Sequence, residues 1–370
     1  MSMNLGPLFE PFEVKSLKLA NRVAMAPMTR NFSPGNVPND DVVAYYKRRA
    51  EGGVGLIITE GTTVNHPAAN GYENVPFFHG EKALAGWKKV VDAVHEAGGK
   101  IVPQLWHVGA VRKEGMEPDP SVPGYAPSGM NRPGKVVCKV MTKEDIQDVV
   151  RAFADAAADA KAIGFDGVEV HGAHGYLIDQ FFWEGTNQRD DEYGGSMANR
   201  QRFAIEIIKA IREKVGPDFP IMLRFSQWKM QDYDAKLCQT PEELEAFLKP
   251  LADAGVDIFH ASTRRFWEPE FEGSKLNLAG WVKKLTGLPT MSVGSVGLTE
   301  DFIAGTFASK KEAVEDAGID ELIERMNNDE FDLIAVGRAL LQDPEWLVKV
   351  KEGRADDVEP FRKASLGELY

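Results

Sequence analysis

The feature that most constrains the fold is a short apolar run that recurs eight times, each followed by a loop and a helical segment. Nearly continuous apolar runs are typical of strands that are buried on both faces of a parallel sheet. The runs are Arg22–Pro27, Val54–Thr59, Lys100–Leu105, Gly167–His171, Pro220–Phe225, Asp257–His260, Pro289–Val293 and Asp332–Val336. Eight strands that alternate with helices favour a closed parallel (β/α)8 barrel, the TIM barrel of the α/β class.

The segments between the runs carry helix signals. Ala83–Ala97 and Ile146–Ile163 have apolar residues at i, i+3 and i+4 spacing, which predicts amphipathic helices. Thr142 is the predicted N-cap of the second helix, and Thr240-Pro241-Glu242-Glu243 predicts a capping box because a Glu follows its Thr by three positions. Three helices are expected to end at glycines that adopt the left-handed conformation, namely Gly98, Gly164 and Gly255.

The connections also bear on the fold. An open doubly wound sheet is the main rival, but it needs a Gly-rich turn after an early strand, and the sequence has no GxGxxG. Residues 7–18 predict a short hairpin that closes the bottom of the barrel. Residues 106–140 and 261–280 are too long for simple connections, so we expect them to build the active face. We expect one domain that spans residues 1–370.

Composition limits the partners and the compartment. The 43 basic and 56 acidic residues among 370 give a net charge of −13, which argues against nucleic acid and anionic membranes as partners. Cys138 and Cys238 fit no disulfide or CxxC framework. The sequence has no signal-peptide pattern and no apolar run of the roughly 20 residues that span a membrane. We expect a cytoplasmic protein with a small-molecule substrate, and a homo-oligomer stays open.

Polar residues and glycines follow nearly every predicted strand. In this fold the C-terminal ends of the strands form the active face, so these residues predict a ligand site. Thr29, Gln104 and Arg224 offer a hydroxyl, an amide and a guanidinium, which suit a flat heterocycle with carbonyls and ring nitrogens. The residues after the last two strands, where barrels commonly bind phosphate, are Gly294, Ser295, Gly337 and Arg338. The pattern predicts a phosphorylated flat cofactor without singling out flavin.

The same residues admit other interpretations. His171 and His174 are spaced like a metal-ligand pair, although a metal site needs three or more ligands and no carboxylate cluster accompanies them. A metal-dependent barrel hydrolase is therefore the alternative from another class, and a non-catalytic barrel that binds a phosphorylated ligand is a third. Arg224 could simply pair with Glu169 in the barrel interior.

Three segments resemble the old yellow enzyme family of FMN-dependent ene-reductases. They are Thr59-Glu60-Gly61, Gln104-Leu105-Trp106-His107 and, most specifically, HGAHGYLIDQFFWEGTNQRDDEYGGSMANRQRF at His171–Phe203. The resemblance covers essentially the whole chain, from PLFEPFEV to AVGRALLQDPEW. It implies a TIM barrel that holds FMN non-covalently and takes hydride from NADPH or NADH.

The resemblance also implies which residues contact FMN. Thr29 would lie near the flavin C4 carbonyl and N5, and Gly61 would leave room beside the ring. Gln104 would pair with the pyrimidine edge, and Arg224 would lie near N1, where the reduced flavin carries negative charge. The other implied FMN contacts are Pro27, Met28, Gly294, Ser295, Gly337 and Arg338.

The implied substrate site lies above the flavin. His171 and His174 would hydrogen-bond the carbonyl or nitro oxygen of the substrate, and Tyr176 would give a proton to the α-carbon. Tyr72 and Trp106 would be aromatic walls of the pocket, with plain packing as the alternative for both. The predicted reaction is the NAD(P)H-dependent, ping-pong reduction of activated C=C bonds in enones, enals, maleimides and nitroalkenes, and also of nitro esters.

Overall fold

The centre of the molecule is a closed barrel of eight parallel strands in the order β10-β11-β12-β13-β14-β3-β4-β5. The structure is a computed structural model, and it describes residues 5–297 and 318–370. The strands are β3 (Val23–Met25), β4 (Leu56–Thr63), β5 (Lys100–Trp106), β10 (Val168–His174), β11 (Ile221–Lys229), β12 (Ile258–Ser262), β13 (Thr290–Val293) and β14 (Leu333–Val336). Each matches one of the eight apolar runs, so the predicted (β/α)8 barrel is confirmed.

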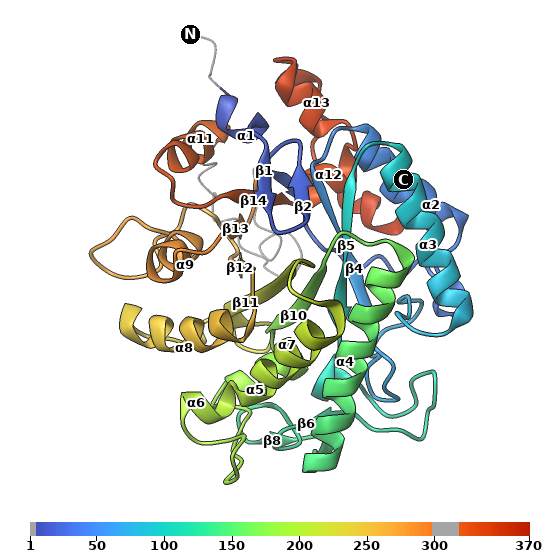
Figure 1. The fold of residues 1–370 in the computed structure, drawn as a ribbon, viewed down its shortest axis with the longest axis vertical. Helices are drawn as coiled ribbons and strands as arrows, with labels where there is room; N and C mark the ends of the chain where they lie inside the picture. Colours follow the sequence, from blue (N-terminus) through green and yellow to red (C-terminus); the bar gives the residue numbers. More distant parts are fainter. Residues whose placement is uncertain (1–4, 298–317) are drawn as a thin grey trace.

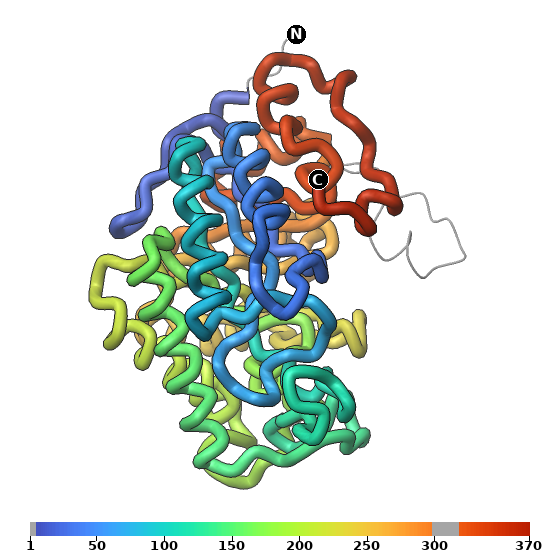
Figure 2. Tube along the Cα trace, turned by 90° about the vertical axis from the view of Figure 1, so that its right-hand side faces the viewer, coloured from blue at the N-terminus to red at the C-terminus, as the bar shows by residue number. Residues whose placement is uncertain are grey.

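Helices surround the strands on the outside of the barrel (Figure 1). Three of them, α2, α3 and α4, stand side by side on one flank (Figure 2). The longer helices are α2 (Asp40–Glu51), α3 (Glu81–Glu96), α4 (Lys143–Ile163), α7 (Arg202–Val215), α8 (Pro241–Ala254), α9 (Leu278–Thr286) and α11 (Ile319–Asn327). The short ones are α1 (Gly6–Phe9), α5 (Leu177–Phe182), α6 (Met197–Arg200), α12 (Arg338–Gln342) and α13 (Trp346–Lys351), with single 3-10 turns at Pro34–Asn36, Gly109–Val111, Ala355–Asp357 and Lys363–Gly367.

The helix ends follow the sequence signals with one exception. Thr142 caps α4, and the Asp145 carboxylate accepts from the Thr142 backbone N–H, which completes a capping box. At α8 the predicted box is wrong. The Thr240 hydroxyl accepts from the Glu243 N–H, but the Glu243 carboxylate reaches one residue further back and accepts from Gln239. The three predicted terminal glycines, Gly98, Gly164 and Gly255, have φ of 81°, 102° and 124°.

The predicted hairpin closes the N-terminal end of the barrel. β1 (Phe12–Val14) and β2 (Leu17–Leu19) pair in an antiparallel manner. Phe12, Leu17 and Leu19 belong to the same buried cluster as the barrel-lining side chains of β4 and β14. The turn between the two strands binds residues that precede β11 and β12, because the Ser16 N–H donates to the Asp218 carbonyl and Lys15 lies 3.9 Å from the Asp257 carboxylate.

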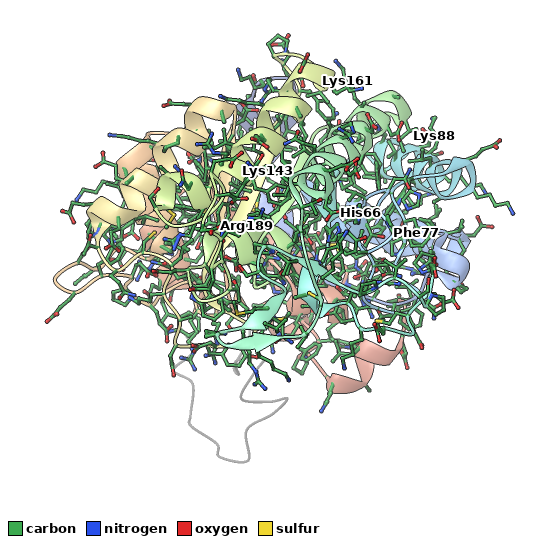
Figure 3. All side chains as sticks on the ribbon, turned by 90° about the horizontal axis from the view of Figure 1, so that it is seen from below. His66, Phe77, Lys88, Lys143, Lys161 and Arg189 are labelled. Atoms are coloured by element: carbon green, nitrogen blue, oxygen red, sulfur yellow. The ribbon has the colours of Figure 1, made fainter. Side chains whose placement is uncertain are left out.

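The long segments lie at the opposite end of the barrel. Residues 106–140 form short strand pairs, β6 (Tyr125–Ala126) with β9 (Lys139–Val140) and β7 (Met130–Arg132) with β8 (Lys135–Val136). Arg189, labelled in Figure 3 beside Lys143, ties the 183–196 loop to this segment, because it donates to the carbonyls of Pro127 and Met141. Among the described residues, no helix is both long and apolar enough to cross a membrane.

Candidate active site

A cavity of about 580 Å³ opens at the C-terminal ends of the barrel strands. Its wall gathers side chains from all parts of the chain, as expected if the strand ends form one site. The predicted site residues on the wall are Pro27, Met28, Thr29, Gln104, Trp106, His171, His174, Tyr176, Arg224, Gly294, Ser295, Gly337 and Arg338.

Two predicted residues, Gly61 and Tyr72, are not in the lining of this cavity but contact Trp106, which is. Gly61 is opposite Gln104 in the β4–β5 pairing, and a Cβ at Gly61 would overlap the Trp106 indole. The space beside Gly61 is therefore filled by Trp106. The Tyr72 ring stacks on the same indole, with the ring centroids 5.5 Å apart and an interplanar angle of 21°.

A buried hydrogen-bonded cluster forms the floor of the cavity. The Gln104 amide donates to one oxygen of Glu169 at 2.9 Å, and Nδ1 of His260 lies 2.7 Å from the other oxygen. Burial alone would raise the pKa of Glu169, but its contact with His260, the charge of Arg224 and the hydrogen bond from Gln104 outweigh burial and hold this pKa below its usual value. Glu169 is thus an anion that fixes the Gln104 amide.

Arg224 and His260 retain unmatched polar atoms in this cluster. Among the described residues, Arg224 Nε and His260 Nε2 are buried and have no hydrogen-bond partner. A buried donor without a partner is costly, so an unmatched guanidinium on a cavity wall indicates a polar ligand. An electron-rich ring edge beside Arg224 and Gln104 fits this donor set, and FMN provides such an edge.

The opposite part of the cavity wall is rich in glycine. Gly294 has φ of 141°, and a Cβ there would lie 2.8 Å from the Thr263 carbonyl oxygen, so the backbone passes too closely for a side chain. Ser295 follows with φ of 55°. Gly337 is the N-cap of α12, and Arg338 begins that helix. Backbone without bulky side chains, followed by an arginine at the start of a helix, is an arrangement that suits a phosphate group.

His171 presents a proton donor to the cavity. Its Nδ1 accepts from the Ala173 N–H at 3.3 Å, so the proton of the neutral ring is assigned to Nε2. Burial, with the nearby Arg224 charge, holds the pKa of His171 well below its usual value and keeps the ring neutral. The ring is parallel to Trp106, with an interplanar angle of 11°, and this stacking fixes its orientation.

His174 is held by strand β11 and its neighbour β12. The β10–β11 register shifts between Gly172 and His174, and His174 has φ of 65°. Such a bulge redirects a side chain at the end of a strand. Nε2 of His174 lies 2.7 Å from the Ser262 hydroxyl, and the ring stacks on Trp228 at 4.6 Å. Burial, with the nearby Arg224 charge, also keeps the pKa of His174 well below its usual value.

Tyr176 lies between the two histidines and the loop that follows β4, which carries Tyr72. It is 7% exposed, and its ring meets Trp106 and His171 edge-on at 4.9 and 5.0 Å. Its hydroxyl is 2.9 Å from the hydroxyl of Tyr72 and 3.6 Å from the sulfur of Met230. Burial raises the pKa of Tyr176 well above its usual value, so the phenol keeps its proton at neutral pH.

A buried ion pair positions the turn that carries Tyr176. Lys229 and Asp179 are fully buried and 2.6 Å apart. The second oxygen of Asp179 accepts from the Gly175 N–H at 2.7 Å, and Lys229 also donates to the Ser226 carbonyl. Burial raises the pKa of Asp179 and lowers that of Lys229, against their mutual attraction. The pair joins the end of β11 to α5, and the hydrogen bond between Asp179 and Gly175 ties α5 to the turn after β10.

We expect the Asp179→Ala substitution to lower the free energy of unfolding by about 3–5 kcal/mol, because Lys229 would remain buried and unpaired. Urea unfolding of the FMN-loaded protein measures this loss. The double variant Asp179→Leu with Lys229→Met is the matched control, and it should be clearly more stable than the single variant. An equal loss of unfolding free energy in the single and the double variant would show that the unpaired Lys229 charge is not the cause of the loss.

Other residues on the wall were not predicted. They are mainly Trp228, Met230, Tyr233, Ser262, Arg264 and Leu366. The first three follow the predicted end of their strand at Phe225. In the structure β11 continues to Lys229, so it contains Trp228, whereas Met230 and Tyr233 lie just beyond it. The alternation of polar and apolar residues in Gln227–Met230 was the available signal for this longer strand. Leu366, from the C-terminal segment, had no signal in the sequence.

The hydrolase alternative lacks a metal site in the described part of the chain. No group of three or more His, Cys, Asp and Glu side chains there could hold a metal ion. His171 and His174 are 5.3 Å apart between ring centroids, and their neighbours are Trp106, Trp228 and Ser262 rather than carboxylates.

Comparisons with known proteins agree with this geometry. The family model for NADH:flavin oxidoreductases and NADH oxidases matches residues 7–357. The chain is 36% identical to an NADH oxidase from Thermoanaerobacter brockii, over 97% of this chain and 53% of the relative. It is 38% identical to 12-oxophytodienoate reductase 2 from Arabidopsis thaliana, over 65% of this chain and 66% of the relative. The chain therefore spans about half to two thirds of these curated relatives.

A solved structure supports the same assignment. Morphinone reductase in complex with tetrahydroNAD matches with a TM-score of 0.80 and 29% identity, covering 97% of this chain and 93% of that chain. Both the match to the family model and this superposition extend over nearly the whole chain. The chain therefore belongs to the NADH:flavin oxidoreductase and NADH oxidase family, which is the FMN-dependent, NAD(P)H-oxidising old yellow enzyme family that its sequence resembles.

Proposed function

We propose that this protein is an ene-reductase that uses NAD(P)H to reduce activated C=C bonds in enones, enals, maleimides and nitroalkenes, and also nitro esters. The observation that carries the proposal is one cavity wall that holds two neutral imidazoles and a protonated phenol together with Gln104 and Arg224. The relatives named 12-oxophytodienoate reductase and morphinone reductase support a reductase. We further propose that residues 1–370 act as one FMN-binding barrel domain.

FMN is assigned to the cavity by its donor set. Gln104, Arg224 and Thr29 would hold the flavin ring, and Pro27 and Met28 would line it. The phosphate would be held by Gly294, Ser295, Gly337 and Arg338. When bound there, FMN would supply the hydride-transfer chemistry between the nicotinamide and the second substrate. Arg224 would favour the reduced flavin through its fixed positive charge.

His171 and His174 would bind the oxygen of the second substrate. Hydride transfer to the β-carbon of an enone moves negative charge onto the carbonyl oxygen. A donor fixed at that oxygen stabilises the charge as it develops. The Nε2 proton of His171 is such a donor, and its ring is held by Trp106. His174 would turn its Nε2 from Ser262 to the substrate oxygen.

Tyr176 would complete the reaction by giving its proton to the α-carbon. The enolate carbon is a much stronger base than a phenolate, so the transfer is downhill even from a phenol with a raised pKa. Nicotinamide and enone would occupy the same cavity in turn, since the two histidines and Tyr176 face one space of about 580 Å³. A shared space predicts ping-pong kinetics.

An anaerobic titration tests the proposal. The purified protein should contain about one FMN per chain, lose its yellow colour with NADH or NADPH, and recover it when cyclohexenone is added. If oxygen restores the yellow colour but no enone or nitroalkene does, the protein is an oxidase and not an ene-reductase. A colourless protein whose hydrolytic activity is abolished by chelators would instead establish the metal-dependent alternative.

A further inference from the structure

We propose that Tyr72 is the outer member of a two-tyrosine proton relay, which returns a proton from solvent to Tyr176 after each turnover. This inference rests on the proposed function, in which Tyr176 gives up its proton. It concerns the Tyr72 hydroxyl, and it leaves the Tyr72 ring as the expected aromatic wall of the substrate pocket. The Tyr72 hydroxyl contacts the hydroxyl of Tyr176, which lines the cavity.

The two tyrosines connect the cavity to the outside of the barrel. Their hydroxyl oxygens are 2.9 Å apart, which is a direct hydrogen bond. Tyr176 lines the cavity and is almost fully buried, whereas Tyr72 is half-buried and adjoins the exposed residues Glu73 and Asn74. A substrate in the cavity would block the direct approach of water to Tyr176. The half-buried Tyr72 would then offer Tyr176 a route to solvent that does not pass through the cavity.

The surroundings of the Tyr176 hydroxyl offer few other proton sources. In the described part of the chain, its side-chain hydrogen-bond partners are the Tyr72 hydroxyl and the Met230 sulfur. A thioether carries no proton. His171 meets the Tyr176 ring edge-on, but as a neutral ring it needs its single proton to donate to the substrate oxygen. Tyr72 is therefore the side chain suited to resupply Tyr176.

The proton balance of the relay is simple. The O–H bond of Tyr176 breaks as its proton forms the new C–H bond at the α-carbon, and Tyr176 is left as a phenolate. The proton of Tyr72 then moves along the existing hydrogen bond to Tyr176. The Tyr72 phenolate takes one proton from water. Each turnover consumes one solvent proton, and neither tyrosine changes its oxidation state.

The surroundings of the two phenols favour proton transfer from Tyr72 to Tyr176. Burial raises the pKa of both phenols, but the pKa of Tyr176 is raised well above its usual value, and Tyr72 raises it further. The pKa of Tyr72 is raised by burial and lowered by its hydrogen bond to Tyr176. Because Tyr176 is almost fully buried and Tyr72 only half-buried, burial penalises a negative charge more on Tyr176 than on Tyr72.

Packing keeps the two hydroxyls together. The Tyr72 ring stacks on one face of Trp106, and the same indole meets the Tyr176 ring edge-on at 4.9 Å. In the loop between β4 and α3, the Tyr72 N–H donates to the side-chain oxygen of Asn70. Figure 3 labels His66 and Phe77, which lie near the two ends of this loop, over the blue part of the ribbon. Phe77 forms a β-bridge with Thr63, so the loop is anchored to the end of β4.

The relay is tested by comparing proton uptake with flavin reoxidation in one turnover. FMN-loaded protein is reduced with one equivalent of NADH or NADPH and mixed anaerobically with cyclohexenone in weakly buffered solution that contains a pH indicator. In the unmodified protein the two signals should coincide. In Tyr72→Phe the flavin signal should keep its rate within about twofold, while proton uptake lags by about tenfold or more. Tyr125→Phe is the matched control and should show no lag, because Tyr125 lies in β6 and its ring contacts His66.

The outcomes separate the relay from the proposed function. Coincident signals in Tyr72→Phe would overturn the relay. A lag in Tyr72→Phe alone supports it, because a merely structural role would slow both signals together. If Tyr176→Phe reoxidises its flavin with cyclohexenone as fast as the unmodified protein, the donor role of Tyr176 fails, and the relay fails with it.

Discussion

Replacing Tyr176 with phenylalanine is expected to slow the reduction of cyclohexenone by about 10²–10⁴-fold, the usual loss when a general acid is removed. The rate at which NADH or NADPH reduces the bound flavin should stay the same, because that half-reaction needs no proton from the phenol. Phenylalanine retains the edge-on packing against Trp106 and His171, so the cavity should keep its shape. Anaerobic stopped-flow measurement of both half-reactions gives the two rates separately.

Tyr193→Phe is the matched control for this substitution. The Tyr193 hydroxyl binds the Glu206 carboxylate outside the cavity, so neither half-reaction should change in that variant. If Tyr176→Phe slows both half-reactions equally, its effect comes from a distorted cavity, and the proton-donor role is wrong.

The second large effect is expected from replacing His171 and His174 together with alanine. Removing one donor from an oxyanion site typically costs about 10²–10³ in rate, so the double variant should lose at least about this factor in enone reduction. Binding of phenols, whose ionised oxygen resembles the enolate oxygen, should weaken in parallel. The change in flavin absorption on titration with para-chlorophenol measures this affinity.

The protonation state of the histidines adds a pH criterion. Both imidazoles have a pKa held well below its usual value by burial, so both are neutral at and above neutral pH and charge only in more acidic solution. Phenol affinity should therefore show no step near the ordinary histidine pKa of about 6.5.

His79→Ala is the control for the double alanine variant, because His79 stacks on Phe77 away from the cavity. Unchanged phenol binding in the double variant would remove the oxyanion assignment.

The sequence by itself determined the barrel and the face that carries the site. Eight apolar runs in alternation with helices leave little choice of sheet, because strands buried on both faces need helices outside. The rule that strand ends form the active face then selects residues such as Gln104, His171 and Arg224, which do line one cavity. The helix caps could also be predicted from the sequence, except that the Glu243 side chain binds the backbone of Gln239 and not that of Thr240.

Only the tertiary structure decided how side chains combine within the site. Tyr72 and Tyr176 are 104 positions apart, and their hydrogen bond depends on the loop after β4 and the turn after β10 meeting at Trp106. Gly61 makes room for that indole, a contact that follows from the β4–β5 register and its bulge. Strand periodicity specifies which residues lie at an end. Long-range packing of irregular segments sets which way their side chains point, because neither loops nor bulges obey a local period.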